Sequence, residues 1–220
     1  MVGRKVIFQV EKIAQPPGKV VLEVENVSTL NNRGLPALKN ISFQVQQGEI
    51  LGIAGIAGNG QSELAEVITG LRSCTGRIII NGADVTNKPP KNAINSGTAH
   101  IPEDRTGVGS APNMDITNNL MMKNFDQEPI SHGWRIDFTS AREHATTMKG
   151  KYDIQAPSIY TNASKLSGGN LQKVILAREI SCCPSLIIAM QPTRGLDVGA
   201  IESIQKLLLE QRANGAAVLL

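Results

Sequence analysis

The stretch Gly55-Ile56-Ala57-Gly58-Asn59-Gly60-Gln61-Ser62 has the spacing G-x-x-x-x-G-x-S. The apolar run Glu49–Ala54 before it has the length of a buried strand, and Gln61–Gly70 after it keeps apolar residues at helical spacing, with Gly70 where a C-terminal cap belongs. Glycines at such a turn let successive backbone N–H groups point at phosphate oxygens, and the helix N-terminus adds its positive dipole end. The stretch therefore predicts a phosphate-binding loop; a glycine turn that serves packing alone is the alternative.

If the loop binds a nucleotide such as ATP, the residues that we expect to contact it are Gly55, Gly58, Asn59, Gly60, Gln61, Ser62 and Glu63. The Ser62 hydroxyl could also reach Mg²⁺, weakly. Phosphate loops of this spacing carry lysine before the serine, and here that residue is Gln61. A pair of unit charges about 4 Å apart is worth roughly 4 kcal/mol at an effective dielectric near 20, and an amide recovers only part of that. We therefore expect weakened nucleotide binding. A dinucleotide-binding loop fits less well, because its third glycine would be Glu63.

Strand and helix signals alternate along the rest of the chain. Further strands are predicted at Val20–Val27, Leu38–Val45, Gly76–Gly82 and Ser185–Met190, with a last one beginning at Ala216. Helices are predicted at Lys91–Ser96, Ile116–Met122, Ser140–Tyr152, Gly169–Ile180 and Val198–Gln211. This alternation indicates an α/β fold with a mainly parallel sheet and helices on both faces.

Two regions depart from this alternation. Residues 1–19 end in the breaker cluster Gln15–Gly18 and are predicted to be a linker, so that the domain would occupy 20–220. Residues of about 105–165 are polar, lack strand signals and are predicted to be a helical insertion; its Trp134 is expected either to contact a partner protein or to pack in a core. The chain ends within the last predicted strand, which favours a domain truncated at its C-terminus.

Composition excludes several classes of function. The chain is 41% hydrophobic and 19% charged, and it has no apolar run of the roughly 18 residues that a membrane helix needs. The net charge of +3 and the 3% aromatic content do not favour nucleic-acid binding. Three cysteines without metal-ligand spacing indicate reduced thiols, with Cys182 and Cys183 expected to serve packing.

A second glycine motif, Leu166-Ser167-Gly168-Gly169-Asn170-Leu171-Gln172-Lys173, opens a predicted helix. It resembles the LSGGQ signature of the ABC ATPase family, in an LSGGN variant. The Ser167 hydroxyl and the amides of Gly168 and Gly169 at a helix N-terminus would form a second anion site. The resemblance implies a P-loop NTPase fold of the ABC type, which has a mainly parallel sheet, an antiparallel β portion and a helical subdomain. It also implies that Leu166 to Asn170 bind a γ-phosphate held by another domain.

Two further segments extend the resemblance. Ile101-Pro102-Glu103-Asp104-Arg105 resembles the Q-loop region, with Glu103 at the Q-loop position. Gln191-Pro192-Thr193-Arg194-Gly195-Leu196-Asp197 resembles the end of Walker B and the D-loop, which would place Asp197 near the nucleotide. In the family, an aspartate that holds Mg²⁺ and a glutamate that acts as base precede Pro-Thr, and here Met190 and Gln191 stand instead. A thioether and a neutral amide cannot replace them, so Gln191 is a degenerate catalytic position.

Within the family, the chain resembles the second nucleotide-binding domain of two-domain ATPases from sugar and nucleoside importers. The resemblance implies an ATPase that is impaired in this half. It implies three partners: an N-terminal ABC domain of the same polypeptide, membrane-spanning permease subunits and, indirectly, a substrate-binding protein. The expected location is the cytoplasmic face of a bacterial plasma membrane. A soluble ABC protein that acts on nucleic acid or ribosomes, and a non-hydrolysing scaffold, are the alternatives.

Overall fold

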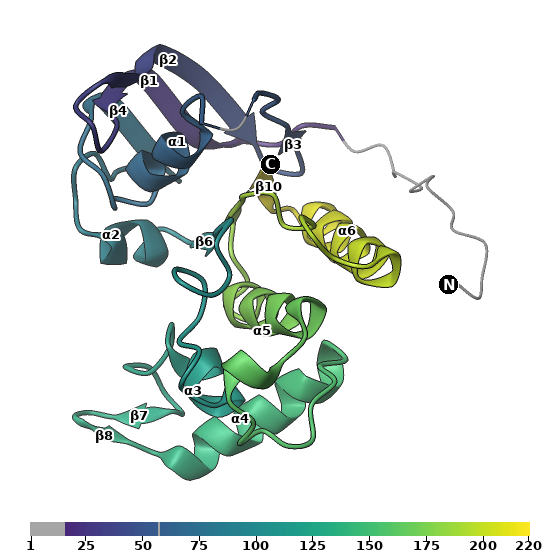
Figure 1. The fold of residues 1–220 in the computed structure, drawn as a ribbon. Helices are drawn as coiled ribbons and strands as arrows, with labels where there is room; N and C mark the ends of the chain where they lie inside the picture. Colours follow the sequence, from purple (N-terminus) through teal and green to yellow (C-terminus); the bar gives the residue numbers. More distant parts are fainter. Residues whose placement is uncertain (1–15, 57) are drawn as a thin grey trace. The chain divides into compact units, whose positions relative to one another are not determined.

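The computed structural model describes residues 16–56 and 58–220, which form two compact units (Figure 1). The β-rich unit contains the described residues up to His100, Cys183–Met190 and Gln205–Leu220. The helical unit contains Ile101–Cys182 and Gln191–Ile204. Of the predicted linker 1–19, residues 1–15 lie outside the described residues.

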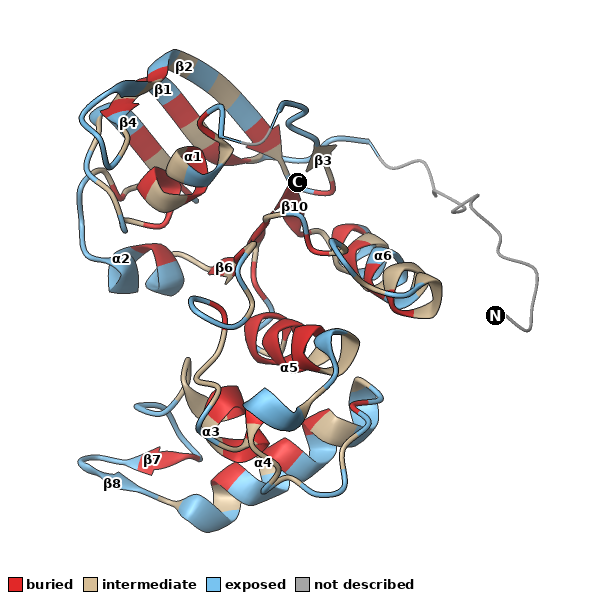
Figure 2. Ribbon diagram, in the orientation of Figure 1, coloured by how far each residue is buried: buried red, intermediate tan, exposed pale blue. Residues whose placement is uncertain are grey.

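The larger sheet of the β-rich unit is antiparallel, in the order β2-β1-β4-β5. Its strands are β1 (Val20–Leu30), β2 (Pro36–Gln46), β4 (Thr75–Ile80) and β5 (Ala83–Asp84). The middle of β1 is paired on both sides, with Val24 opposite Phe43 of β2 and opposite Ile78 of β4. Buried residues of β1 and β4 mostly alternate with less buried ones, apart from irregular positions in β1, as expected for a sheet with one face on a core (Figure 2).

The second sheet has the order β3-β10-β9-β6. Its strands are short: β3 (Ile50–Leu51), β10 (Ala217–Leu219), β9 (Leu186–Ala189) and β6 (Thr98–Ile101). β10 runs parallel to both β3 and β9, and all four residues of β9 are buried. The predicted α/β class with parallel and antiparallel portions and helical parts is therefore confirmed. The strand expected within Glu49–Ala54 is present but shorter and less buried than expected, because β3 covers only Ile50–Leu51, is half-buried, and is followed by exposed irregular chain at residues 52–54.

Helix α1 (Gln61–Ile68) covers the core of the β-rich unit with its buried face. The cap predicted at Gly70 is confirmed: Gly70 has a φ of +76°, its N–H donates to the Val67 carbonyl, and the Leu71 N–H donates to the Glu66 carbonyl. These two bonds are those of a Schellman motif. A Cβ at Gly70 would lie 2.4 Å from the Lys88 carbonyl oxygen, so only glycine fits. The same unit holds α2 (Pro90–Asn95).

The helical unit is built from α3 (Ile116–Met121), α4 (Phe138–Lys151), the 3-10 turn η1 (Ala163–Lys165) and α5 (Gly168–Ile180). Their apolar residues pack in one cluster, which includes Ile116, Leu120, Ala145, Met148, Val174 and Ala177. Side chains cap each α-helix: Asp115 caps α3, Asp137 caps α4 and Ser167 caps α5. Helix α6 (Val198–Ala213) begins in this unit and ends in the β-rich unit.

Two expectations for the helical unit and its end are wrong. A hairpin of β7 (Ser131–His132) and β8 (Arg135–Ile136) lies where strand signals are lacking, and Trp134 at its turn is 86% exposed, which excludes the core role. Its two-residue turn contains Gly133 at a φ of +68°, as short hairpins require.

Cys182 and Cys183 are exposed rather than packed, because they follow the last turn of α5. None of the helices in the described ranges is long and apolar enough to span a bilayer.

Candidate phosphate-binding sites

The first candidate site is the N-terminus of α1 in the β-rich unit. Gly60 precedes the helix with a φ of +98°, and a Cβ there would lie 2.7 Å from the Ala37 carbonyl oxygen, so the position requires glycine. Gly58 also has a positive φ of 91°. Among the described residues no side chain caps this helix, in contrast to the helices of the other unit. Its first backbone N–H groups are therefore available to an anion.

Gln61 occupies the inside of this loop. Its Nε2 donates to the Ile56 carbonyl at 3.2 Å, and a Cβ at Gly55 would lie only 2.2 Å from that nitrogen. A neutral amide thus closes the loop where phosphate loops of this spacing carry a lysine ammonium. Ser62 is exposed, and Glu63 adds a carboxylate in the first helical turn. The loop supplies backbone donors but no positive side chain.

The end of β9 lacks an acidic pair. Met190, which follows the strand, packs against the hydrophobic core of the β-rich unit. Gln191 is exposed and has a left-handed φ of 43°, an uncommon conformation for a residue other than glycine, and its carbonyl accepts the Arg194 N–H. In the part of the chain that the structure describes, no three His, Cys, Asp or Glu side chains are grouped as a metal site.

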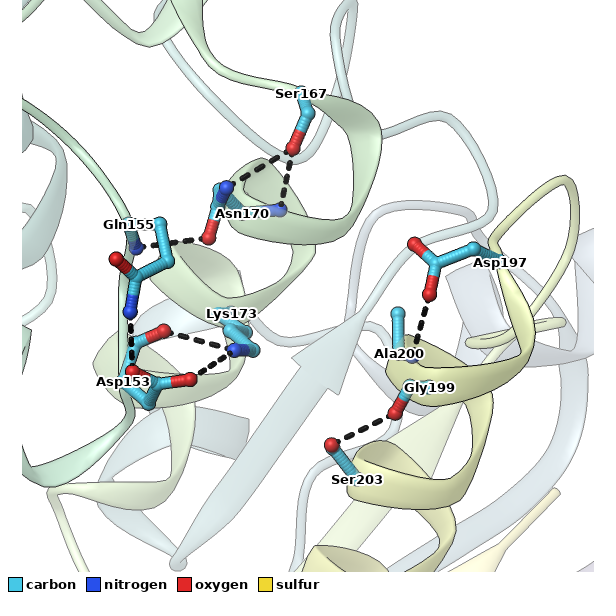
Figure 3. Close-up of polar contacts among 9 residues, drawn as sticks. All are labelled: Asp153, Gln155, Ser167, Asn170, Lys173, Asp197, Gly199, Ala200 and Ser203. Atoms are coloured by element: carbon cyan, nitrogen blue, oxygen red, sulfur yellow. Dashed lines mark hydrogen bonds and ion pairs between the residues drawn. The ribbon is translucent and has the colours of Figure 1, made fainter. Parts of the chain in front are cut away.

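The second candidate site is the N-terminus of α5 in the helical unit (Figure 3). Ser167 caps the helix by accepting from the Asn170 N–H, and Leu166 packs against the helical core. A Cβ on Gly168 would make only ordinary contacts, the nearest at 3.6 Å from Leu196, whereas a Cβ on Gly169 would lie 3.3 Å from that of Ala200. Glycine in a helix costs about 1 kcal/mol relative to alanine, and packing does not require it at Gly168. A bare backbone at Gly168 suits close approach of a ligand.

The structure brings Asp197 beside this helix. Its Oδ1 accepts from the Ala200 N–H at 3.0 Å, which caps the first turn of α6 (Figure 3). Its Oδ2 would lie 3.7 Å from a Cβ on Gly169. The Ser203 hydroxyl donates to the Gly199 carbonyl at 2.8 Å and continues this turn. Asp197 is therefore fixed by the helix that it caps, close to the signature glycines.

Glu103 is linked to other residues of the helical unit by Arg194 and Arg105, whose contacts the sequence did not predict. The Glu103 carboxylate forms an ion pair with Arg194. Arg105 donates from Nε to Oε1 of Gln172 at 2.7 Å and from Nη2 to the Arg194 carbonyl. Burial, followed by the neighbouring charge of Arg194, lowers the pKa of Arg105. The only signal for Arg105 was its place in the Pro-Glu-Asp-Arg segment.

Thus Glu103, Leu166 to Asn170 and Asp197 lie together in the helical unit, whereas Gly55 to Glu63 belong to the β-rich unit. A model of the ABC transporter family matches residues 38–194, which is more than half of the chain. This chain belongs to the ABC transporter family.

Import proteins of the ABC family are among its relatives. The chain is 46% identical over 223 residues to the glucose import ATP-binding protein TsgD13 of Haloferax volcanii, covering 100% of this chain and 40% of that protein. It is 44% identical over 221 residues to the guanosine import ATP-binding protein NupO of Bacillus subtilis, covering 100% and 43%. It is 42% identical over 220 residues to the nucleoside import ATP-binding protein NupA of Lactococcus lactis, covering 100% and 44%. The chain therefore spans less than half the length of these relatives.

Solved ABC structures share the fold. A nucleotide-free ATP-binding cassette from an ABC transporter superposes with a TM-score of 0.75 at 25% identity, covering 91% of this chain and 80% of the other. A dimeric cassette, MJ0796, in a post-hydrolysis state with ADP and Pi superposes with a TM-score of 0.75 at 21% identity, covering 90% and 86%. The second likeness concerns the fold alone.

Proposed function

We propose that this ABC chain is the degenerate second nucleotide-binding half of an importer for nucleosides or simple sugars. In this proposal its signature helix completes an ATP site whose phosphate loop belongs to the partner domain. Its own phosphate loop binds nucleotide weakly and does not hydrolyse it.

One contrast carries the proposal. The signature helix has a capping serine and a bare backbone at Gly168, both suited to an anion, and Asp197 beside it is held by the α6 cap. The chain's own catalytic positions are replaced, because Gln61 is neutral and Met190 packs in a core. A half that hydrolysed ATP itself would need the residues that Gln61 and Met190 replace. An intact signature beside these replacements fits a half that serves the ATP site of its partner.

The residues fit a phosphate group but do not fit Mg²⁺. The open N-terminus of α1 offers backbone donors to a nucleotide phosphate. Mg²⁺ needs several oxygen ligands in octahedral geometry, but among the described residues no three His, Cys, Asp or Glu side chains are grouped, and Met190 offers a thioether where the family has an aspartate. In this half we therefore assign no step to a metal ion.

The proposed partners follow from the relatives. Because the chain spans 40–44% of the importer proteins that it matches, we place an N-terminal ABC domain in the same polypeptide. Permease subunits and, indirectly, a substrate-binding protein complete the importer, which sets the chain at the cytoplasmic face of a plasma membrane. The names of NupO and NupA favour nucleosides, and that of TsgD13 favours a simple sugar.

Two measurements on the chain itself test the proposal. ATP turnover by the 220-residue chain should stay at background, and turnover that Ser62→Ala abolishes would refute the impaired half. Gln61→Lys should tighten ATP binding in calorimetry without creating turnover, since a lysine restores charge but no base. Equal affinity of the parent and Gln61→Lys chains would show that the loop is no phosphate cradle.

A further inference from the structure

The Ser167 hydroxyl has both of its acceptor positions engaged by one residue. Asn170 donates to the Ser167 Oγ from its backbone nitrogen at 3.4 Å and from its side-chain Nδ2 at 3.0 Å (Figure 3). A serine hydroxyl has two lone pairs and one proton. When two N–H groups point at the oxygen, the proton must point elsewhere. Ser167 is thus left as a hydrogen-bond donor.

The orientation of the Asn170 amide is fixed by a third group. The backbone N–H of Gln155 donates to Oδ1 of Asn170 at 2.9 Å. A backbone N–H can only donate, so the amide atom that faces it must be the oxygen. The nitrogen of the amide therefore faces Ser167, and a flipped amide would place two donors against each other.

The segment that carries Gln155 is held in turn by α5. Lys173, one turn beyond Asn170, donates from Nζ to the Asp153 carbonyl at 2.8 Å and to its carboxylate at 3.0 Å. The Gln155 side chain also donates to that carboxylate. The hydrogen bond from Lys173 is the largest cause that lowers the pKa of Asp153. Residues 153–155 are therefore fastened at two points to the helix whose N-terminus they face.

We propose that Asn170 is a positioning residue that, held by the Gln155 backbone, orients the Ser167 hydroxyl as a donor towards the γ-phosphate. The inference rests on the proposed function, because it assumes that the signature meets a phosphate held by the partner domain. It goes further in assigning to Asn170 no contact with the nucleotide. The side chain acts through Ser167.

An ordinary helix cap in the same unit provides the matched control. At α4 the capping residue is Asp137, and Ser140 occupies the position that Asn170 has in α5, three residues after the cap. The Ser140 hydroxyl donates to the Asp137 carboxylate at 2.9 Å. Ser140→Ala removes the same kind of contact from a helix start without a signature motif.

The test is a double-mutant cycle in the full-length transporter reconstituted with its permease, with ATP as the probe. Asn170→Ala should lower kcat by roughly two- to tenfold at unchanged KM, the loss expected for one hydrogen bond. In the Ser167→Ala background the same substitution should change nothing, because a residue that acts through Ser167 has no role once the hydroxyl is gone. Ser140→Ala should match the parent.

A second variant guards against misfolding. Asn170→Asp keeps the size of the side chain and an oxygen for the Gln155 N–H, but its other oxygen can only accept and would draw the Ser167 proton inward. It should also lower kcat, and a parent kcat in this variant would overturn the inference.

Two further outcomes distinguish a failure of the positioning role of Asn170 from a failure of the proposed function. An equal loss from Asn170→Ala in both backgrounds would show that Asn170 acts independently of Ser167, which refutes the positioning role alone. Parent turnover in Ser167→Ala would refute the proposed function itself.

Discussion

Arg105 donates a hydrogen bond from Nε to Oε1 of Gln172 at 2.7 Å, and Gln172 is 0% exposed. The same guanidinium donates to the carbonyl of Arg194, whose side chain pairs with Glu103. One side chain thus ties the Pro-Glu-Asp-Arg segment to the signature helix and to the loop that leads to Asp197. Its loss would leave a buried amide oxygen without its charged donor.

We therefore predict that Arg105→Met, which keeps the apolar stem, lowers the free energy of unfolding by about 1–3 kcal/mol. Chemical denaturation followed by circular dichroism measures the change. Arg135→Met is the control, because Arg135 is exposed and stacks over Trp134 at 4.7 Å. Equal denaturation midpoints for the two variants would contradict the structural role of Arg105.

The sequence predicted elements whose signals are local and missed those defined by pairing. Helix α1 and its Gly70 cap follow from apolar spacing and from a residue that tolerates a positive φ. β6 (Thr98–Ile101) and the hairpin at Trp134 were missed, because strands of two to four residues carry too few alternating positions to show a period. Their existence depends on partners elsewhere in the chain.

A buried ion triad provides the second prediction. Glu179 accepts from Lys123 at 2.6 Å and from Arg178 at 2.9 Å, and its side chain is 7% exposed. Glu179→Gln would leave two buried cations without their carboxylate, and breaking a buried pair in this way typically costs about 3–5 kcal/mol. For a domain of this size, thermal unfolding should shift downward by roughly 2–4 °C per kcal/mol. The exposed acid Glu143, replaced by glutamine, should shift the melting temperature far less; similar shifts would contradict the triad's importance.

The third prediction concerns pH. Burial lowers the pKa of His144 below its usual 6.5, and no described group hydrogen-bonds its Nε2. Below pH 6.5 the unfolded chain takes up a proton that the folded chain resists, so this residue makes the free energy of unfolding fall as the pH drops. His144→Gln should weaken the decline between pH 7.5 and 5.5, measured by urea denaturation. The same change at the exposed His132 should not, and an unchanged decline in His144→Gln would exclude this residue as the cause.

The candidate site divides in the same way as the fold. The phosphate loop and the signature were recognisable because their glycines and serines follow one another in the chain. The sequence could not reveal the roles of Arg105, Gln172 and Gln155, since each role is defined by a contact between residues at least fifteen positions apart. Met190 stands where the family has its metal-binding aspartate, and its packing against the core explains how the chain accommodates a thioether there.

The central claim is a division of labour in which this half supplies a signature to its partner and has no productive site of its own. It is tested most directly by comparing ATP turnover and uptake by the full-length transporter carrying Ser167→Arg with the same transporter carrying Gln61→Ala. Loss of a preorganised donor to a transition-state charge typically costs about a hundred- to a thousandfold in rate.

We predict that Ser167→Arg abolishes turnover and uptake while this chain keeps its fold and nucleotide affinity, and that Gln61→Ala leaves turnover nearly unchanged. If Gln61→Ala stops transport and Ser167→Arg is tolerated, the roles are reversed and this half is the one that hydrolyses ATP.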